Sequence, residues 1–165
     1  MTDPFIPIDI TEEQRFFGWA SGGGNVFLTG EAGTGKTTQL RRFLESPQAP
    51  AGIAVTASTG IAALNINGST IHRWAGIELG ADEHETFEEA ITRLKAREYP
   101  AARKAMQRVR DAGTVVIDEI SMLPGRQLNF LDAWFRNLRD RDEPFGGIQM
   151  IFVGDFLQLP PVRTN

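Results

Sequence analysis

The 165-residue sequence contains no cysteine, which excludes a disulfide scaffold and a thiolate metal site. No stretch approaches the roughly 20 apolar residues of a membrane-spanning helix, and the N-terminus has no basic segment, so neither a membrane contact nor a secretion signal is expected. The formal net charge is −4, so any contact with nucleic acid must be a local site of modest affinity. The length fits one domain with a real core, but not two.

A complete phosphate-binding loop is present between two apolar segments. Residues 30–37 read GEAGTGKT, preceded by the apolar run 26–28 and followed by the helix-like segment 39–44. The glycines let backbone N–H groups wrap a phosphate chain, Lys36 brings a positive charge to the β and γ phosphates, and the Thr37 hydroxyl can ligate Mg²⁺. The residues expected to bind the nucleotide are Gly30, Ala32, Gly33, Thr34, Gly35, Lys36, Thr37 and Thr38. This pattern predicts binding of ATP or ADP with Mg²⁺.

Four short apolar runs alternate with helix-like or polar stretches. The runs cover residues 25–29, 53–56, 115–118 and 148–153. Alternation of this kind predicts an α/β fold with a parallel sheet that carries helices on both faces.

Three further segments have helical patterns. Residues 11–20 open with a capping-box signal, residues 83–111 indicate two solvated helices broken at Pro100, and residues 124–140 carry apolar side chains at helical spacing. The aromatic side chains of Trp74 and Trp134 are expected in the core rather than in base stacking.

A second group of polar residues follows the run 115–118. Asp118 would hold the hydration shell of Mg²⁺, and Glu119 would polarise the water that attacks the γ-phosphate. Apolar strands often end in acidic residues, so this signal depends on the phosphate loop for its meaning. Small-molecule kinases commonly lack the neighbouring glutamate, which favours an NTP-driven motor or switch of the RecA type.

A third group follows the run 148–153. In a RecA-like sheet this strand lies between the phosphate-loop strand and the strand that ends in Asp118, so that Gln158 would lie near the γ-phosphate and report its presence. The alternative is that Gln158 is an ordinary residue of a surface loop.

From about Thr11 to Val162 the chain resembles the first motor domain of the Pif-type helicases, superfamily 1B enzymes that move 5′ to 3′ along single-stranded DNA. The segments that carry the resemblance are 56–63 (TASTGIAA), 68–72 (GSTIH), 117–122 (IDEISM), 154–162 (GDFLQLPPV) and the family's signature segment 136–149. The resemblance implies a RecA-like P-loop NTPase domain over residues 25–165, preceded by a segment 1–24 with an adenine-reading glutamine. It also implies roles in DNA repair, recombination and telomere maintenance, in the nucleoid of a bacterial or phage system or in the nucleus or mitochondria of a eukaryote.

Individual site residues follow from the same resemblance. Gln14 matches the adenine-reading glutamine, although its place in the capping box is an equally good explanation. The family's contacts with DNA phosphates fall on Ser58, Thr59, Gly60, Thr70 and His72. A helix cap alone would explain the first three, and a histidine after an apolar residue is more often structural.

The family's second motor domain is not expected within these 165 residues. The arginine that reaches the γ-phosphate from that domain would then be missing, so little hydrolysis and no unwinding are expected from this chain alone. Two alternatives stay open from the sequence. One is a small P-loop kinase, which would lack the inserted strand, and the other is a nucleotide-binding interaction module that does not hydrolyse its ligand.

Overall fold

The computed structural model describes residues 11–31, 33–78 and 85–155. Its centre is a five-stranded sheet in the order β1-β5-β4-β2-β3, in which every pairing is parallel. The strands are β1 (Val26–Thr29), β2 (Ala54–Ala57), β3 (Ser69–Thr70), β4 (Thr114–Asp118) and β5 (Gln149–Gly154). The predicted parallel α/β sheet is therefore confirmed, and the two-residue strand β3 is an addition that no apolar run indicated.

The position of β5 separates two of the functional alternatives. This last strand lies between β1 and β4, where Ile151 pairs with both Val26 and Val116. The inserted strand agrees with the RecA-like arrangement predicted from the sequence and disfavours the small-kinase alternative, for which no such strand was expected.

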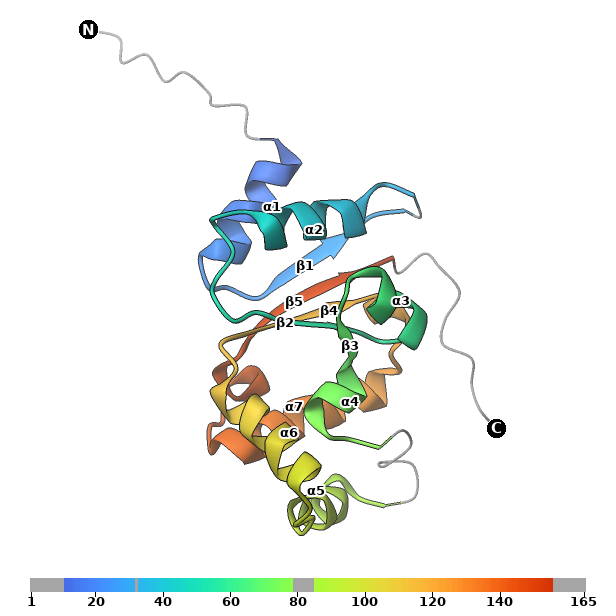
Figure 1. Ribbon diagram of the computed structural model, residues 1–165, viewed down its shortest axis with the longest axis vertical. Helices are drawn as coiled ribbons and strands as arrows, with labels where there is room; N and C mark the ends of the chain where they lie inside the picture. Colours follow the sequence, from blue (N-terminus) through green and yellow to red (C-terminus); the bar gives the residue numbers. More distant parts are fainter. Residues whose placement is uncertain (1–10, 32, 79–84, 156–165) are drawn as a thin grey trace, which may run out of the picture.

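Helices cover both faces of the sheet (Figure 1). On one face lie α1 (Glu12–Ser21), α2 (Lys36–Glu45) and α3 (Gly60–Asn65). On the other lie α4 (Ile71–Ala75), α5 (Phe87–Lys95), α6 (Pro100–Asp111) and α7 (Gly125–Arg139), with two short 3₁₀ helices, η1 (Ile120–Met122) and η2 (Pro144–Gly147). Successive residues of β4 point to opposite faces of the sheet. Val116 packs against the face covered by α1, α2 and α3, while Val115 and Ile117 pack against the face covered by α4 to α7.

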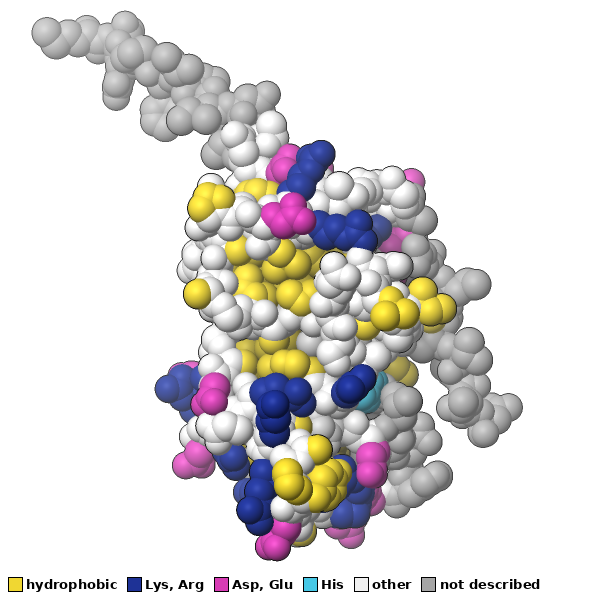
Figure 2. All heavy atoms as spheres, in the orientation of Figure 1, with side chains coloured by type: hydrophobic (Ala, Val, Ile, Leu, Met, Phe, Trp, Pro, Cys, Tyr) yellow, Lys and Arg dark blue, Asp and Glu magenta, His cyan; other side chains and the backbone are white. Residues whose placement is uncertain are grey.

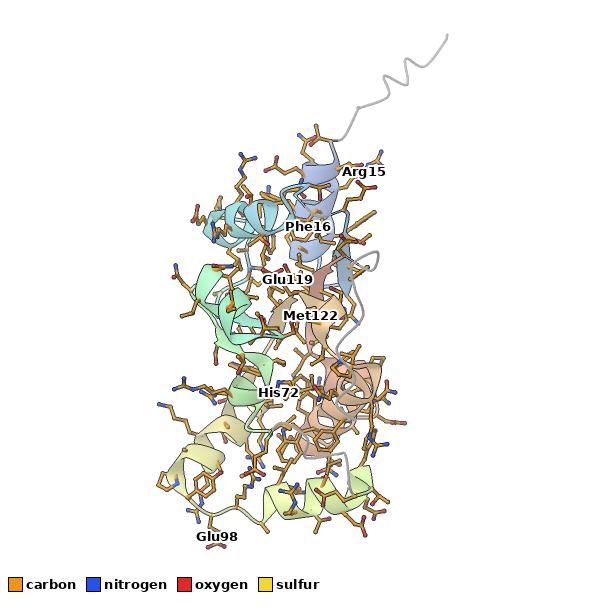
Figure 3. The ribbon with its side chains drawn as sticks, turned by 90° about the vertical axis from the view of Figure 1, so that its right-hand side faces the viewer. Arg15, Phe16, His72, Glu98, Glu119 and Met122 are labelled. Carbon is orange, nitrogen blue, oxygen red and sulfur yellow. The ribbon has the colours of Figure 1, made fainter. Side chains whose placement is uncertain are left out.

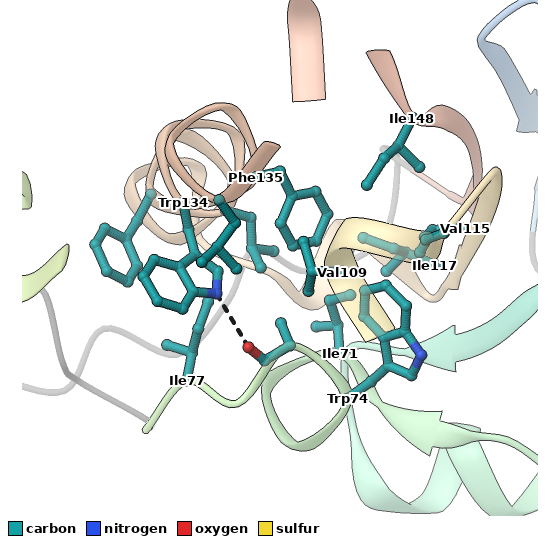
Figure 4. Packing of buried hydrophobic residues seen from close by; sticks show 14 of the residues in the cluster. Ile71, Trp74, Ile77, Val109, Val115, Ile117, Trp134, Phe135 and Ile148 are labelled. Atoms are coloured by element: carbon teal, nitrogen blue, oxygen red, sulfur yellow. Dashed lines mark hydrogen bonds between the residues drawn. The ribbon is translucent and has the colours of Figure 1, made fainter. Parts of the chain in front are cut away.

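The larger core contains the two tryptophans whose burial the sequence predicted. Trp134 of α7 is 1% exposed and Trp74 of α4 is 9% exposed. The indole Nε1 of Trp134 donates a hydrogen bond of 3.0 Å to the carbonyl oxygen of Ala75, which joins α7 to the end of α4 (Figure 4). Phe135 meets the Trp74 ring edge-on at 6.0 Å between centroids.

The two helices expected between residues 83 and 111 are present, but their description as solvated is wrong. Each has an apolar stripe buried against the larger core, with Ala90 and Leu94 on α5 and Ala105 and Val109 on α6. The many charged residues of this segment occupy only the outer faces, and a stripe about 100° wide is enough to dock each helix.

The signature segment 136–149 runs from the last turn of α7, through η2, to the first residue of β5. Arg139 donates hydrogen bonds to the carbonyl oxygens of Gly146 in η2 at 2.7 Å and of Ala112 at 2.7 Å, and it also contacts the carbonyl oxygens of Val109 and Arg110 at the end of α6. The guanidinium of Arg139 therefore joins α7 to η2 and to the end of α6. Within the described ranges, no helix is both long and apolar enough to cross a bilayer.

Candidate nucleotide and DNA site

The phosphate loop joins the end of β1 to the first turn of α2. Gly33 and Gly35 have φ angles of +80° and +84°, a left-handed conformation that glycine adopts without steric cost. At Gly30, a Cβ atom would lie 2.9 Å from the hydroxyl oxygen of Thr34. These positions explain why the loop needs its glycines to curl tightly at the helix N-terminus.

Lys36 lies inside this loop. Its Nζ donates hydrogen bonds of 2.7 Å to the carbonyl oxygens of Gly30 and Glu31, and the hydroxyl of Thr34 donates to the same Glu31 carbonyl at 2.8 Å. The ammonium group is thereby held at the N-terminus of α2, where the helix dipole also favours an anion.

Asp118 ends β4 beside the loop. Its Oδ2 accepts a hydrogen bond of 3.3 Å from the Thr37 hydroxyl, and its Oδ1 accepts one of 2.9 Å from the backbone N–H of Glu119. Burial raises the pKa of Asp118, while these two hydrogen bonds and the charge of Lys36 act in the opposite direction. A hydroxyl and a carboxylate in contact are the oxygen donors that Mg²⁺ takes when phosphates and water complete its shell, so both residues fit the predicted metal role.

Glu119 has an unusual backbone conformation. Its φ of +55° and ψ of 42° are left-handed, and its carbonyl oxygen accepts a hydrogen bond of 2.6 Å from the Ser58 hydroxyl. Burial raises the pKa of the Glu119 carboxyl, the charges of Asp118 and Asp155 raise it further, and Lys36 opposes them. Figure 3 shows Glu119 near the middle of the molecule. A raised pKa suits a residue that accepts a proton from water.

The first group of predicted DNA contacts lies at the same edge of the sheet. The backbone N–H of Ser58 donates to the carbonyl oxygen of Asp118 at 3.0 Å, and Thr59 caps α3 by accepting from the N–H of Ala62 at 3.2 Å. Gly60 is exposed as the first residue of that helix. The cap expected as an alternative is therefore present, and phosphate contact by these residues stays a prediction.

The second group lies on the neighbouring strand and helix. Thr70 pairs with Ala57 in the sheet and caps α4, accepting from the N–H of Arg73 at 3.3 Å. His72 is 7% exposed, with its Nε2 3.0 Å from the Oε1 of Gln127. This hydrogen bond agrees with the structural explanation that the sequence left open, and a DNA contact by His72 stays a prediction.

Gln14 forms the capping box that its spacing predicts. Its Oε1 accepts from the backbone N–H of Thr11 at 2.9 Å, and its own N–H donates to the Thr11 hydroxyl at 3.2 Å. The Gln14 side chain also lines a hollow of about 490 Å³ with Phe17 and Gln48, which leaves room for a second role. Ala32 and Gln158, both predicted from the sequence, lie outside the described residues.

Two charged residues near the site were missed by sequence reasoning. Asp155 is 4% exposed directly after β5, and Arg41 of α2 lowers the pKa of Asp118. The signal for Asp155 was available, because a polar residue that ends a parallel strand lies at the edge where ligands bind. Arg41 carries no such signal, since its position depends on how α2 packs.

Comparison with known proteins identifies relatives over nearly the whole chain. ATP-dependent DNA helicase PIF1 of Saccharomyces cerevisiae is 45% identical over 164 residues, which cover 97% of this chain and 18% of the relative. ATP-dependent DNA helicase Pif1 of a Psychrobacter species is 43% identical over 146 residues, covering 87% of this chain and 21% of the relative. The chain thus spans about a fifth of the length of these curated relatives.

Solved structures show the same fold. The crystal structure of Pif1 helicase from Candida albicans aligns with a TM-score of 0.79 and 43% identity over 94% of this chain and 34% of that one. Pif1 helicase from Bacteroides, crystallised in complex with ADP-AlF3 and single-stranded DNA, aligns with a TM-score of 0.76 and 34% identity over the same shares. A family model described as PIF1-like helicase matches residues 16–165, and the chain belongs to that family.

Proposed function

We propose that this chain is the nucleotide-binding motor domain of a 5′-to-3′ DNA helicase, which binds Mg²⁺-ATP at the phosphate loop and phosphates of single-stranded DNA at the same edge of the sheet. The observation that carries the proposal is the meeting of Lys36, Thr37 and Asp118 around the N-terminus of α2. Relatives named ATP-dependent DNA helicases support it, as does the relative crystallised with ADP-AlF3 and single-stranded DNA.

The residues of the loop would act mainly by position and charge. Lys36 would release the carbonyl oxygens of Gly30 and Glu31 and turn to the β and γ phosphates. Thr37 and Asp118 would hold the metal, which supplies neutralisation of the phosphate charge when bound. Gln14 would read the adenine with the side of its amide that the capping box does not use.

Glu119 would orient and deprotonate the attacking water. Its backbone leaves the extended conformation of β4 for a left-handed one, and its carbonyl oxygen accepts a hydrogen bond from the Ser58 hydroxyl. The nearby ammonium of Lys36 opposes the rise that burial causes in the pKa of this carboxyl. Hydrolysis by this chain alone should be slow, because an arginine from a second motor domain typically contributes about 10³ to 10⁵ in rate.

DNA would bind across the ends of β2 and β3. Ser58, Thr59, Gly60 and Thr70 offer small hydroxyls and backbone N–H groups, which recognise phosphates without reading bases. The proposal therefore predicts weak, salt-sensitive and nearly sequence-independent binding of single strands. In the cell the protein would accompany DNA, whichever compartment holds it.

Titration with a fluorescent ATP analogue tests the nucleotide site. Lys36→Ala should abolish binding, while Lys95→Ala, which removes the same group from the far helix α5, should leave it unchanged. Unchanged affinity for the ATP analogue in the Lys36 variant would contradict the proposed nucleotide site.

Turnover with and without single-stranded DNA separates a motor domain from a module that only binds nucleotide. Adding the C-terminal portion of a related helicase should raise ATP hydrolysis, and Glu119→Gln should remove the gain. DNA-stimulated turnover of about 1 s⁻¹ or more by the 165 residues alone would contradict the expected need for a second domain.

A further inference from the structure

A groove lined by basic residues lies between α4 and α6, away from the phosphate loop. It has a volume of about 380 Å³, and its polar lining includes Arg73, Arg97, Tyr99, Lys104 and Arg108. Figure 2 shows Lys and Arg side chains gathered on this face of the molecule. We call this feature the α4–α6 groove.

The charge of the groove contrasts with that of the whole chain. Arg97 is paired with Glu78 at 2.6 Å, so these two lining residues neutralise each other. Arg73, Lys104 and Arg108 have no carboxylate partner in the part of the chain that the structure describes. Three exposed, unneutralised cations around one hollow, in a protein of net charge −4, indicate a site for an anion with several charges.

The groove is also partly preorganised. The Nη2 of Arg108 donates to the carbonyl oxygens of Arg73 at 3.2 Å and of Trp74 at 2.9 Å, which holds the guanidinium on the rim. The floor is closely packed, since a Cβ atom at Gly76 would lie 2.7 Å from the Cβ of Ala105. A ligand would therefore meet one held charge, that of Arg108, above the close contact of Gly76 with Ala105.

The spacing of the cations fits a nucleic acid backbone. Lys104 and Arg108 are four residues apart on α6, about 6 Å along the helix axis, close to the advance of two nucleotides, about 7 Å, along one strand of a duplex. Tyr99, which is 52% exposed at the start of α6, offers a ring on which a base can stack.

The groove is continuous with the proposed DNA site. His72, a predicted DNA contact, lines it, and the same short helix α4 is capped by Thr70, the last residue of β3. We infer that the α4–α6 groove is a second DNA-binding site, which holds the phosphates of a single strand as it leaves the sheet edge. This inference rests on the proposed function for the identity of the strand, but its residues are separate from those that bind nucleotide.

The test is fluorescence anisotropy of labelled oligo-dT with the 165-residue chain, using a strand of about 6 nucleotides that covers one site and one of about 20 that reaches both. The variant is Arg73→Gln with Lys104→Gln, two exposed side chains whose loss should not disturb folding. The matched control is Arg103→Gln with Arg110→Gln, which removes two cations of α6 outside the groove.

The groove variant should bind the long strand at least about fivefold more weakly and lower the salt slope by about 1.4, since each phosphate contact on a single strand contributes about 0.7. Its affinity for the short strand and for ATP should stay unchanged. Tyr99→Ala should weaken binding of the long strand, and Tyr99→Phe should restore it.

Three outcomes would overturn the inference: no loss in the groove variant, an equal loss in the control, or displacement of the DNA by poly-aspartate of the same charge as readily as by oligo-dT. If Ser58→Ala weakens binding of the short strand while the groove variant binds the long strand as tightly as wild type, the second site is refuted and the proposed DNA site at the sheet edge stands. If neither strand binds, the proposed DNA site fails with it.

Discussion

Replacing Glu119 by glutamine should make the protein more stable while it removes the proposed catalytic base. The carboxyl is partly buried beside Asp118 and Asp155, and no hydrogen bond to it is present within the described residues. Glutamine keeps the length and shape of the side chain and the same left-handed backbone, so the comparison isolates the charge.

The expected gain is about 1 kcal/mol at neutral pH. Two like charges about 4 Å apart repel by about 1 kcal/mol in water and about 4 kcal/mol at an effective dielectric constant near 20. Glu119 is partly exposed and is also attracted to Lys36, so the net repulsion should lie at the lower end of this range. A gain of this size corresponds to about 2–4 °C in Tm for a chain of this length.

The pH dependence of the gain follows from the raised pKa. Below the ordinary value of 4.5 the carboxyl is protonated in the folded and unfolded states alike, and the two proteins should be equally stable. As the pH rises, Glu119 ionises first in the unfolded wild type. The stability of the wild type therefore falls until the pH passes the pKa of Glu119 in the folded state. The gain from glutamine should therefore grow with pH and then level off.

Urea unfolding followed by tryptophan fluorescence from about pH 4 to pH 8 measures this difference. Glu98→Gln is the control. The Glu98 side chain is 87% exposed and its ion pair with Arg103 is long, at 3.9 Å, so the substitution should change stability by less than about 0.5 kcal/mol. A loss of stability at neutral pH, or a difference that does not vary with pH, would refute the reasoning.

Three further substitutions test the packing that supports the site, each by urea unfolding. Arg139→Met should cost about 2–4 kcal/mol, because it removes a charged donor from several backbone carbonyls, and a cost below about 0.5 kcal/mol would show that water replaces it. Gly154→Ala should cost about 1–3 kcal/mol, since its Cβ would lie 2.8 Å from a methyl group of Ile120, and a neutral result would mean that η1 moves freely. Trp134→Phe should cost about 1–3 kcal/mol by leaving the Ala75 carbonyl unpaired, and equal stability would show that this hydrogen bond does not stabilise the fold.

The sequence was most informative where one local pattern determines the structure. The phosphate loop, the strand before it and the helix after it were predicted because apolar runs and glycines at this spacing have few structural meanings. The strand ending in Asp118 took its meaning from the phosphate loop, and the insertion of β5 was predicted from the RecA-like arrangement. The capping box at Thr11 was found for the same reason.

Prediction was weaker where long-range contacts decide the structure. Strand β3 has only two residues, so no periodicity could indicate it, and its place depends on pairing with β2. The prediction that α5 and α6 are solvated was based on their many charged residues. It did not take account of the narrow apolar stripe on each helix. The burial of His72 depends on Gln127, 55 residues later, and no spacing rule connects the two.

The hydrogen bond from the Ser58 hydroxyl to the Glu119 carbonyl joins the end of β2 to the residue proposed to activate water. Ser58 is also bound through its backbone N–H to the carbonyl of Asp118, so β2 cannot shift at this end without moving the backbone of both acidic residues. The two ends of this short linkage belong to the proposed DNA edge and to the proposed nucleotide pocket. Under the proposed function, a DNA strand that pulls on Ser58 would therefore act on the backbone of both acidic residues through two hydrogen bonds, without a motion of the whole domain.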